Sequence, residues 1–146
     1  MEIHDPNLHL KLIEMCDCYL GTDYAPTIQK VADAPSADVQ EDALRYLALS
    51  LLFALTEKAH QLSIKRKKDK ITVTIKHDDE KIALRPPTRV VFERIITIMR
   101  AIIHLDEDKG GLPLILGLKN DQVEVQVKIE RTADKETLKV KLPELG

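Results

Sequence analysis

The chain has 146 residues, of which 44% are apolar, 32% charged and only 3% aromatic, and its formal net charge is −2. This length fits one domain with a sizeable core, which must be built mainly from Leu, Ile and Val. The near-neutral charge gives no general bias towards polyanions, and base stacking or sugar binding would need more aromatic side chains. We therefore expect one domain over residues 1–146 and do not expect a nucleic-acid partner.

The sequence shows no signal peptide, no membrane span and no disulfide framework, and these features bear on compartment and redox state. Residues 1–11 do not have the basic and then apolar pattern of a secretory signal, and no apolar run approaches the length of about 20 residues that a membrane span needs. Cys16 and Cys18 are the only cysteines, so there is no disulfide framework. We expect a cytoplasmic protein with two reduced thiols, that of Cys16 partly buried.

A helical segment opens the chain. Asp5 and Pro6 are typical of a helix start, and residues 25–31 are expected to add one or two further turns before a loop at 32–37. The apolar residues that recur at helical spacing in the first helix are Leu8, Leu12, Met15, Cys16 and Tyr19. Residues 1–35 are thus a helical preface to the main body.

Two longer helices are predicted in the body of the domain, residues 38–145. Asp38 and Glu41 have the spacing of a capping box before the first, and Thr88 can cap the second. The apolar stripe of the first consists of Ala43, Leu44, Leu47, Ala48, Leu51, Leu52, Leu55 and Ala59, and that of the second of Val91, Phe92, Ile95, Ile98, Met99, Ile102 and Leu105. Both stripes are expected to face the core.

Strands follow each of these helices. Alternating apolar residues predict a strand starting at Leu62 and Ile64, an exposed basic turn over 65–70, a second strand through Val73 and a third over 81–85. The later strands are expected at 112–118, 123–129 and 138–142, joined at 119–121 and 133–135. The order α-βββ-α-βββ with hairpin connections predicts an α+β fold whose mainly antiparallel sheet packs against helices.

No catalytic, cofactor-binding or metal-binding residues emerge from the sequence. None of the five glycines opens a phosphate-binding loop, and the acidic runs at 78–80 and 106–108 lack the alternating oxygen ligands of a calcium loop. The histidines are dispersed over different predicted elements: His4, His9, His60, His77 and His104. We therefore expect a protein that is not an enzyme and carries no cofactor.

One basic cluster remains, and it consists of Lys65, Arg66, Lys67, Lys68 and Lys70. Such a cluster can contact nucleic acid, phospholipid or an acidic protein surface, or it can simply keep a hairpin soluble and its edge unpaired. We favour the second interpretation, because no aromatic residues interleave with the cations and the net charge is negative.

A family resemblance rests on the segment AHQLSIKRKKDKITVTIKHD, through Ala59, Leu62, Ile64, Val73 and Asp78. In this register residues 43–145 resemble the N-terminal domain that precedes the motor domain of type II secretion and type IV pilus assembly ATPases. That family carries A-S-D-I-H-I-E-P, a turn, and V-R-x-R-x-D-G. Further downstream, the Pro86-Pro87 and Leu112-Pro113 pairs of this chain also fit the pattern of the family.

The charged residues of the family motifs are replaced. Its Asp, His, Glu and Pro fall at Gln61, Ser63, Lys65 and Arg66; its two arginines, which reach towards nucleotide, fall at Thr74 and Lys76; and its glycine falls at Asp79. Walker motifs are absent from the sequence. The resemblance therefore implies a degenerate stand-alone copy that acts as a non-enzymatic interaction or regulatory module, with a secretion or pilus motor component as partner.

Two other functions stay open from the residues. One is a small-molecule or nucleotide sensor with its ligand between sheet and helices, and the other is a secretion-chaperone-like binder of extended segments. The first helix could pack on the body or pair across a homodimer, because its apolar stripe suits either arrangement.

Overall fold

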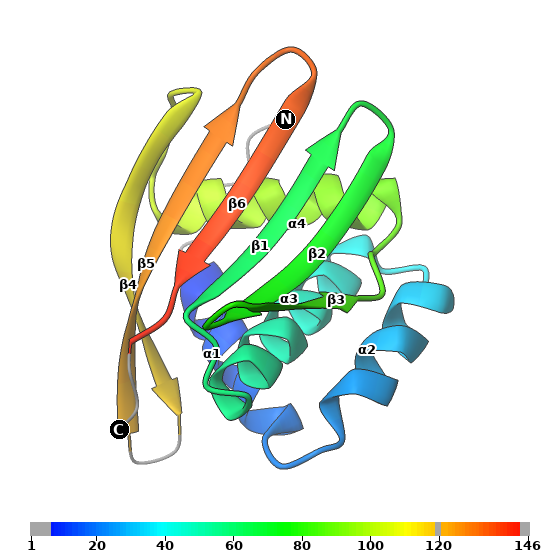
Figure 1. Ribbon diagram of the computed structural model, residues 1–146, viewed down its shortest axis with the longest axis vertical. Coiled ribbons are helices and arrows are strands. Elements are labelled where there is room, and N and C mark those ends of the chain that lie inside the picture. The colour runs from blue at the N-terminus through cyan, green and yellow to red at the C-terminus, as the bar shows by residue number, and fades with distance from the viewer. Residues whose placement is uncertain (1–6, 119–120, 144–146) are drawn as a thin grey trace.

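The computed structural model describes residues 7–118 and 121–143, and these form two layers, a sheet and a set of helices that covers one of its faces (Figure 1). The helices are α1 (Leu8–Tyr19), α2 (Tyr24–Asp33), α3 (Val39–Thr56) and α4 (Arg89–Ile102). The strands are β1 (Gln61–Lys67), β2 (Lys70–His77), β3 (Glu80–Leu84), β4 (Lys109–Leu118), β5 (Asp121–Arg131) and β6 (Lys135–Lys141). The predicted α+β fold and the order α-βββ-α-βββ after the helical preface are confirmed.

The sheet has the strand order β3-β2-β1-β6-β5-β4, and every neighbouring pair is antiparallel. Each run of three strands forms its own meander, and the two meanders join where β1 pairs with β6. In this central pair, Leu62 lies opposite Val140 and Ile64 opposite Leu138. All four side chains are buried, so the junction of the two meanders is also the middle of the core.

Helix α3 is the centre of the helical layer, because it contacts α1, α2, α4 and β1. Tyr46 and Leu47 of α3 are fully buried, as is Phe92 of α4, and α4 crosses behind the strands in Figure 1. Period-2 alternation turns the apolar side of each strand towards these helices. The core is mainly aliphatic, as the composition predicted.

The predicted helix starts are confirmed at the two caps that can be compared. The Asp38 carboxylate accepts the Glu41 N–H at 3.1 Å, and the Thr88 hydroxyl accepts the Val91 N–H at 3.3 Å. The capping box is nevertheless only half formed. The Glu41 side chain pairs with Arg45 at 2.6 Å, and the Asp38 N–H donates instead to the hydroxyl of Ser36 at 3.2 Å.

The N-terminal segment differs from the sequence prediction in detail. The predicted start at Asp5 and Pro6 lies outside the described residues. Helix α2 is longer than the predicted 25–31, because Tyr24 and Ala32 at its two ends are also buried. Cys18 is exposed, whereas Cys16 is buried more deeply than predicted; burial, helped by the charge of Asp17, raises the pKa of the Cys16 thiol to about 12.

The predicted turn over residues 65–70 is wrong in its extent. Strand β1 continues to Lys67 and β2 begins at Lys70, so only Lys68 and Asp69 make the turn. The reason is Arg66, whose side chain is buried on the helix side of the sheet. Its guanidinium donates to the Lys68 carbonyl at 2.6 Å and pairs with Glu136 at 3.1 Å, and these partners compensate the buried charge.

Strand β4 begins at Lys109, three residues before the predicted start, and it forms an edge of the sheet. Pro113 lies in this strand, which is the sheet position where a missing N–H costs least. The Ile115 carbonyl is hydrogen-bonded to the His9 ring of α1 at 2.7 Å. Both features limit the pairing of this edge with another strand.

Gly111 is required by the close approach of β4 to β5. A Cβ atom at this position would lie 2.5 Å from the backbone oxygen of Val127, whereas a Cβ at Gly110 would meet only the end of the Leu105 side chain, at 2.6 Å. We expect Gly111→Ala to lower the free energy of unfolding by about 1–3 kcal/mol, the usual cost of forced overpacking. Gly110→Ala is the matched control and should cost less in urea denaturation, since Leu105 can move. Equal losses would contradict this account.

The Tyr46 side chain connects α3 to Arg85, the residue that follows β3. Its hydroxyl donates to the Arg85 carbonyl at 2.5 Å, and its ring is fully buried. Tyr46→Phe keeps the ring but leaves that carbonyl without this donor, so we expect a loss of about 1–3 kcal/mol in the free energy of unfolding. Tyr19→Phe, at a half-buried site, is the comparison in urea denaturation. A Tyr46→Phe protein as stable as the parent would show that water replaces the hydroxyl.

Candidate anion-binding surface

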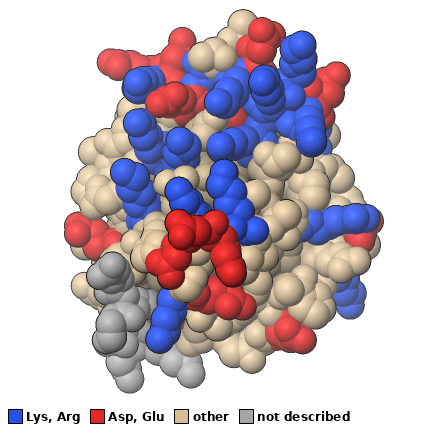
Figure 2. Space-filling model, in the orientation of Figure 1, with Lys and Arg blue, Asp and Glu red and all other residues tan. Residues whose placement is uncertain are grey.

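The face of the sheet opposite the helices carries alternate residues of all the strands in the described ranges, and lysine predominates among its charged residues. We call this surface the lysine face. Its lysines are Lys65 and Lys67 of β1, Lys70 and Lys76 of β2, Lys81 of β3, Lys109 of β4, Lys128 of β5, and Lys135, Lys139 and Lys141 of β6. Figure 2 shows basic side chains across the strands on this side of the molecule.

Lys65 lies near the centre of the lysine face. In the strand register it stands between Thr72 of β2 and Thr137 of β6, and its side chain is partly buried. Partial burial, together with repulsion from Lys139, Lys135 and Lys81, holds the pKa of Lys65 below its usual range. Burial is the larger cause, and the three ammonium groups add a positive potential at Lys65 that a bound anion would reduce.

Neutral hydrogen-bonding groups lie between the lysines. Ser63 stands between Thr74 and Lys139 in the register, and the Gln61 amide donates to the Ser63 hydroxyl at 2.9 Å. Lysine, serine, threonine and glutamine are side chains that commonly donate to carboxylate and phosphate oxygens. Ser63 and Thr137 are themselves buried, so the exposed part of the lysine face offers an anion mainly ammonium groups, together with the neutral side chains of Gln61, Thr72 and Thr74.

Acidic residues limit the positive surface at its ends. On the face itself, Glu130 lies 3.7 Å from Lys109 and 3.6 Å from Lys128. Asp69 lies in the β1–β2 turn at one end of the sheet, and Asp78 and Asp79 lie in the β2–β3 turn at the other. Acidic groups flank the basic area from above and below in Figure 2. The positive field is thus a bounded patch.

A cluster of two histidines and one carboxylate lies at the β2–β3 end of the sheet. The rings of His60 and His77 stack with centroids 6.0 Å apart and planes 10° apart, and the His60 Nε2 atom lies 3.1 Å from the Asp78 carboxylate. Hydrogen bonding to His60 and the charge of His77 lower the pKa of Asp78. Asp78 also has φ of +52°, a left-handed conformation that Asp and Asn tolerate better than most residues.

Across residues 7–118 and 121–143, no group of three or more His, Cys, Asp or Glu side chains could hold a metal ion. Likewise, no helix in these ranges is long and apolar enough to cross a membrane.

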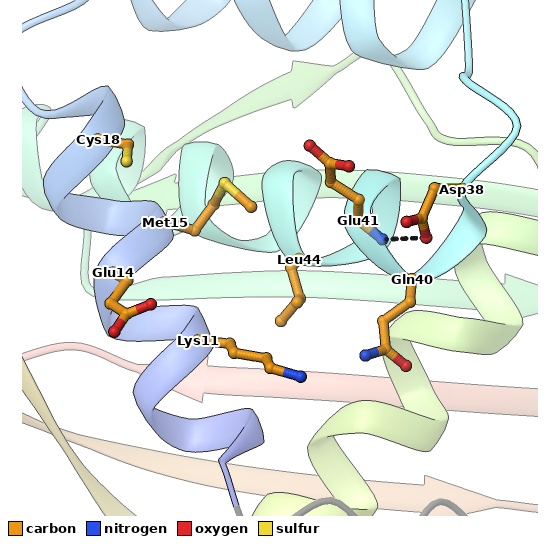
Figure 3. Close-up of a pocket in the computed structure, with 8 residues that line it drawn as sticks. All are labelled: Lys11, Glu14, Met15, Cys18, Asp38, Gln40, Glu41 and Leu44. Atoms are coloured by element: carbon orange, nitrogen blue, oxygen red, sulfur yellow. Dashed lines mark hydrogen bonds between the residues drawn. The ribbon is translucent and has the colours of Figure 1, made fainter.

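A pocket of about 330 Å³ lies between α1 and the start of α3 (Figure 3). Its lining consists of Lys11, Glu14, Met15, Cys18, Asp38, Gln40, Glu41 and Leu44. Asp38 is already engaged as the cap of α3, and carboxylates line the pocket together with apolar groups. This mixed lining does not define one class of ligand.

The predicted basic cluster is divided by the structure. Lys65, Lys67 and Lys70 lie on the lysine face and Lys68 lies in the turn, whereas Arg66 is buried on the opposite side. Sequence reasoning missed the lysines of the other strands. The available signal was the alternation of lysine with apolar residues, as in residues 139–142, which predicted a strand but not what lies beside it.

The residues that carry the family resemblance have structural roles in this fold. Ala59, Leu62, Ile64 and Val73 are buried in the core, and Asp78 lies in the left-handed turn position. No protein-family model matches the chain, and no curated protein matches it. The resemblance to secretion ATPase domains therefore remains a proposal.

The hydrogen bond between His60 and Asp78 predicts that the stability of the protein depends on pH. A carboxyl whose pKa is lower in the folded than in the unfolded protein contributes stability above its unfolded pKa of about 4 and loses it as pH falls through the folded value. We expect Asp78→Asn to reduce stability at pH 6 and to have a smaller effect at pH 3. Urea denaturation at the two pH values, with Asp79→Asn as control, measures this. A constant difference between the two pH values would contradict it.

Proposed function

We propose that the protein is a non-enzymatic interaction module that docks through the lysine face onto an acidic surface of a protein partner. The observation that carries the proposal is the gathering of lysines on a sheet face that none of the described helices covers, in a chain whose net charge is −2. Such an asymmetric charge distribution steers a complementary surface to one side of a protein.

An acidic protein fits this surface better than a nucleic acid does. The aromatic residues of the chain are Tyr19, Tyr24, Tyr46, Phe53 and Phe92, and all lie on helices, so the lysine face has no stacking platform for bases. A long polyanion would also extend over the acidic turns at the ends of the sheet and be repelled there. An acidic patch of limited extent on a protein would not reach these turns and would not be repelled by them.

The family resemblance suggests where such a partner is found. Thr74 and Lys76 occupy the positions of the two arginines of the ATPase motif, and both lie on the lysine face. The resemblance implies that in the family these two arginines reach towards nucleotide held by a motor domain. This correspondence supports a cytoplasmic partner among secretion or pilus motor components, and a role for the chain as a degenerate copy of the family domain.

A synthetic peptide of alternating Glu and Thr tests the docking surface, with fluorescence anisotropy as the measurement. Lys76 and Lys141 flank Gln61 on the lysine face and are exposed. We expect Lys76→Glu/Lys141→Glu to weaken peptide binding about tenfold, which corresponds to a loss of about 1.4 kcal/mol over two screened contacts. The control Lys30→Glu/Lys58→Glu makes the same charge change outside this face and should leave binding unchanged.

Three outcomes would contradict the proposal. Equal losses in the two double variants would show a dependence on net charge alone. Tighter binding of a single-stranded oligonucleotide than of the peptide would assign the face to nucleic acid. ATP turnover by the purified protein that Lys76→Ala abolishes would show that it is an enzyme.

A further inference from the structure

The surroundings of Lys65 combine two properties that no other lysine discussed above shares. In the strand register Lys65 stands between Thr72 and Thr137 at the centre of the sheet, and Lys139, Lys135 and Lys81 contribute positive potential from two other strands. A small dianion such as a phosphoryl group would find several ammonium donors and the exposed Thr72 hydroxyl within one area. Lys65 would then lie beside the chemical group that is bonded to the phosphoryl group.

We propose that Lys65 is a site of acylation by acyl phosphates, with the neighbouring lysines holding the phosphoryl group and Lys65 supplying the attacking amine. The inference shares the lysine face with the proposed function but does not depend on its protein partner. The reagent class is an acyl group joined to phosphate through a mixed anhydride.

The chemistry needs no other co-reactant. The neutral Nζ of Lys65 attacks the acyl carbonyl carbon, and a C–N bond forms while the C–O bond to phosphate breaks. Phosphate leaves with the bonding electron pair and takes the proton that the amine loses. The products are an N-acyl lysine and hydrogen phosphate, so atoms and charge balance.

The neighbouring lysines assist in two separable ways. They enrich an anionic reagent at the surface, and they add to partial burial, the larger cause, in lowering the pKa of Lys65 and so favour its neutral, nucleophilic form. A bound phosphoryl group offsets part of the repulsion that lowers this pKa. A neutral acylating reagent reports the second contribution alone, because it is not drawn to the lysines.

Acylation would also regulate docking. It removes the positive charge at the centre of the lysine face, as lysine acylation does wherever an ammonium contributes to an ionic contact. The modified protein should bind the acidic peptide more weakly than the unmodified protein does. This effect links the modification to the surface without requiring that the natural partner be known.

The test is incubation of the full chain with acetyl phosphate at pH 7.5, followed by peptide mapping of each lysine by mass spectrometry. We expect Lys65 to be modified about tenfold faster than the exposed Lys30 of α2, the lower end of the enrichment that a surface of one sign produces for a counter-ion. Inorganic phosphate should compete. With a neutral N-hydroxysuccinimide ester the preference for Lys65 should be smaller.

Variants then show whether the neighbours are responsible. Lys135→Gln/Lys139→Gln should reduce the rate at Lys65 towards that at Lys30, whereas Lys109→Gln, at the far edge of the sheet, should not. The comparison of Lys65 with Lys30 in the parent protein needs no variant, so a folding defect cannot obscure it. Equal rates at Lys65 and Lys30, or a preference that phosphate and the double variant leave unchanged, would overturn the inference. Peptide binding by unmodified protein tests the proposed function separately.

Discussion

The antiparallel pairing of β1 with β6 is the constraint on which the rest of the structure depends. It joins two three-stranded meanders into one sheet and aligns the aliphatic side chains of both on the same face, where Ile64 meets Leu138. Since side chains alternate along a strand, the same register also aligns the polar residues on the other face. A slip of one residue would turn the aliphatic residues of one meander to solvent and its lysines into the core.

The helices cover one face only, and this asymmetry creates the candidate site. Helix α3 contacts the other three helices and β1, so the apolar sides of helices and sheet meet in one layer. Among residues 7–118 and 121–143 no helix covers the opposite face, which carries lysines from neighbouring strands (Figures 1 and 2). A protein that is slightly acidic as a whole therefore has a basic surface on one side, and this surface supports both proposals made here.

The sequence predicted the elements well because their signals are local. Helix caps at Asp38 and Thr88, apolar stripes and period-2 strands each depend on residues only a few positions apart. The errors lie where the pairing of a charged side chain decides the outcome, with a distant partner in one case and a partner one helical turn away in the other. Arg66 was assigned to an exposed turn, but Glu136, seventy positions away, allows it to be buried within a strand. Glu41 was expected to complete a capping box, but it pairs with Arg45 instead.

The candidate site was largely beyond sequence reasoning for the same reason. Local periodicity was enough to establish an aliphatic core, the α+β class and the alternation of lysine with apolar residues along single strands. Only the tertiary structure decided that β1 and β6 are neighbours, and hence that Lys65 and Lys139 act on one another. Strand order and register depend on backbone hydrogen bonds between segments far apart in the chain, and a lysine repeated along one strand carries no information about the strand that will lie beside it.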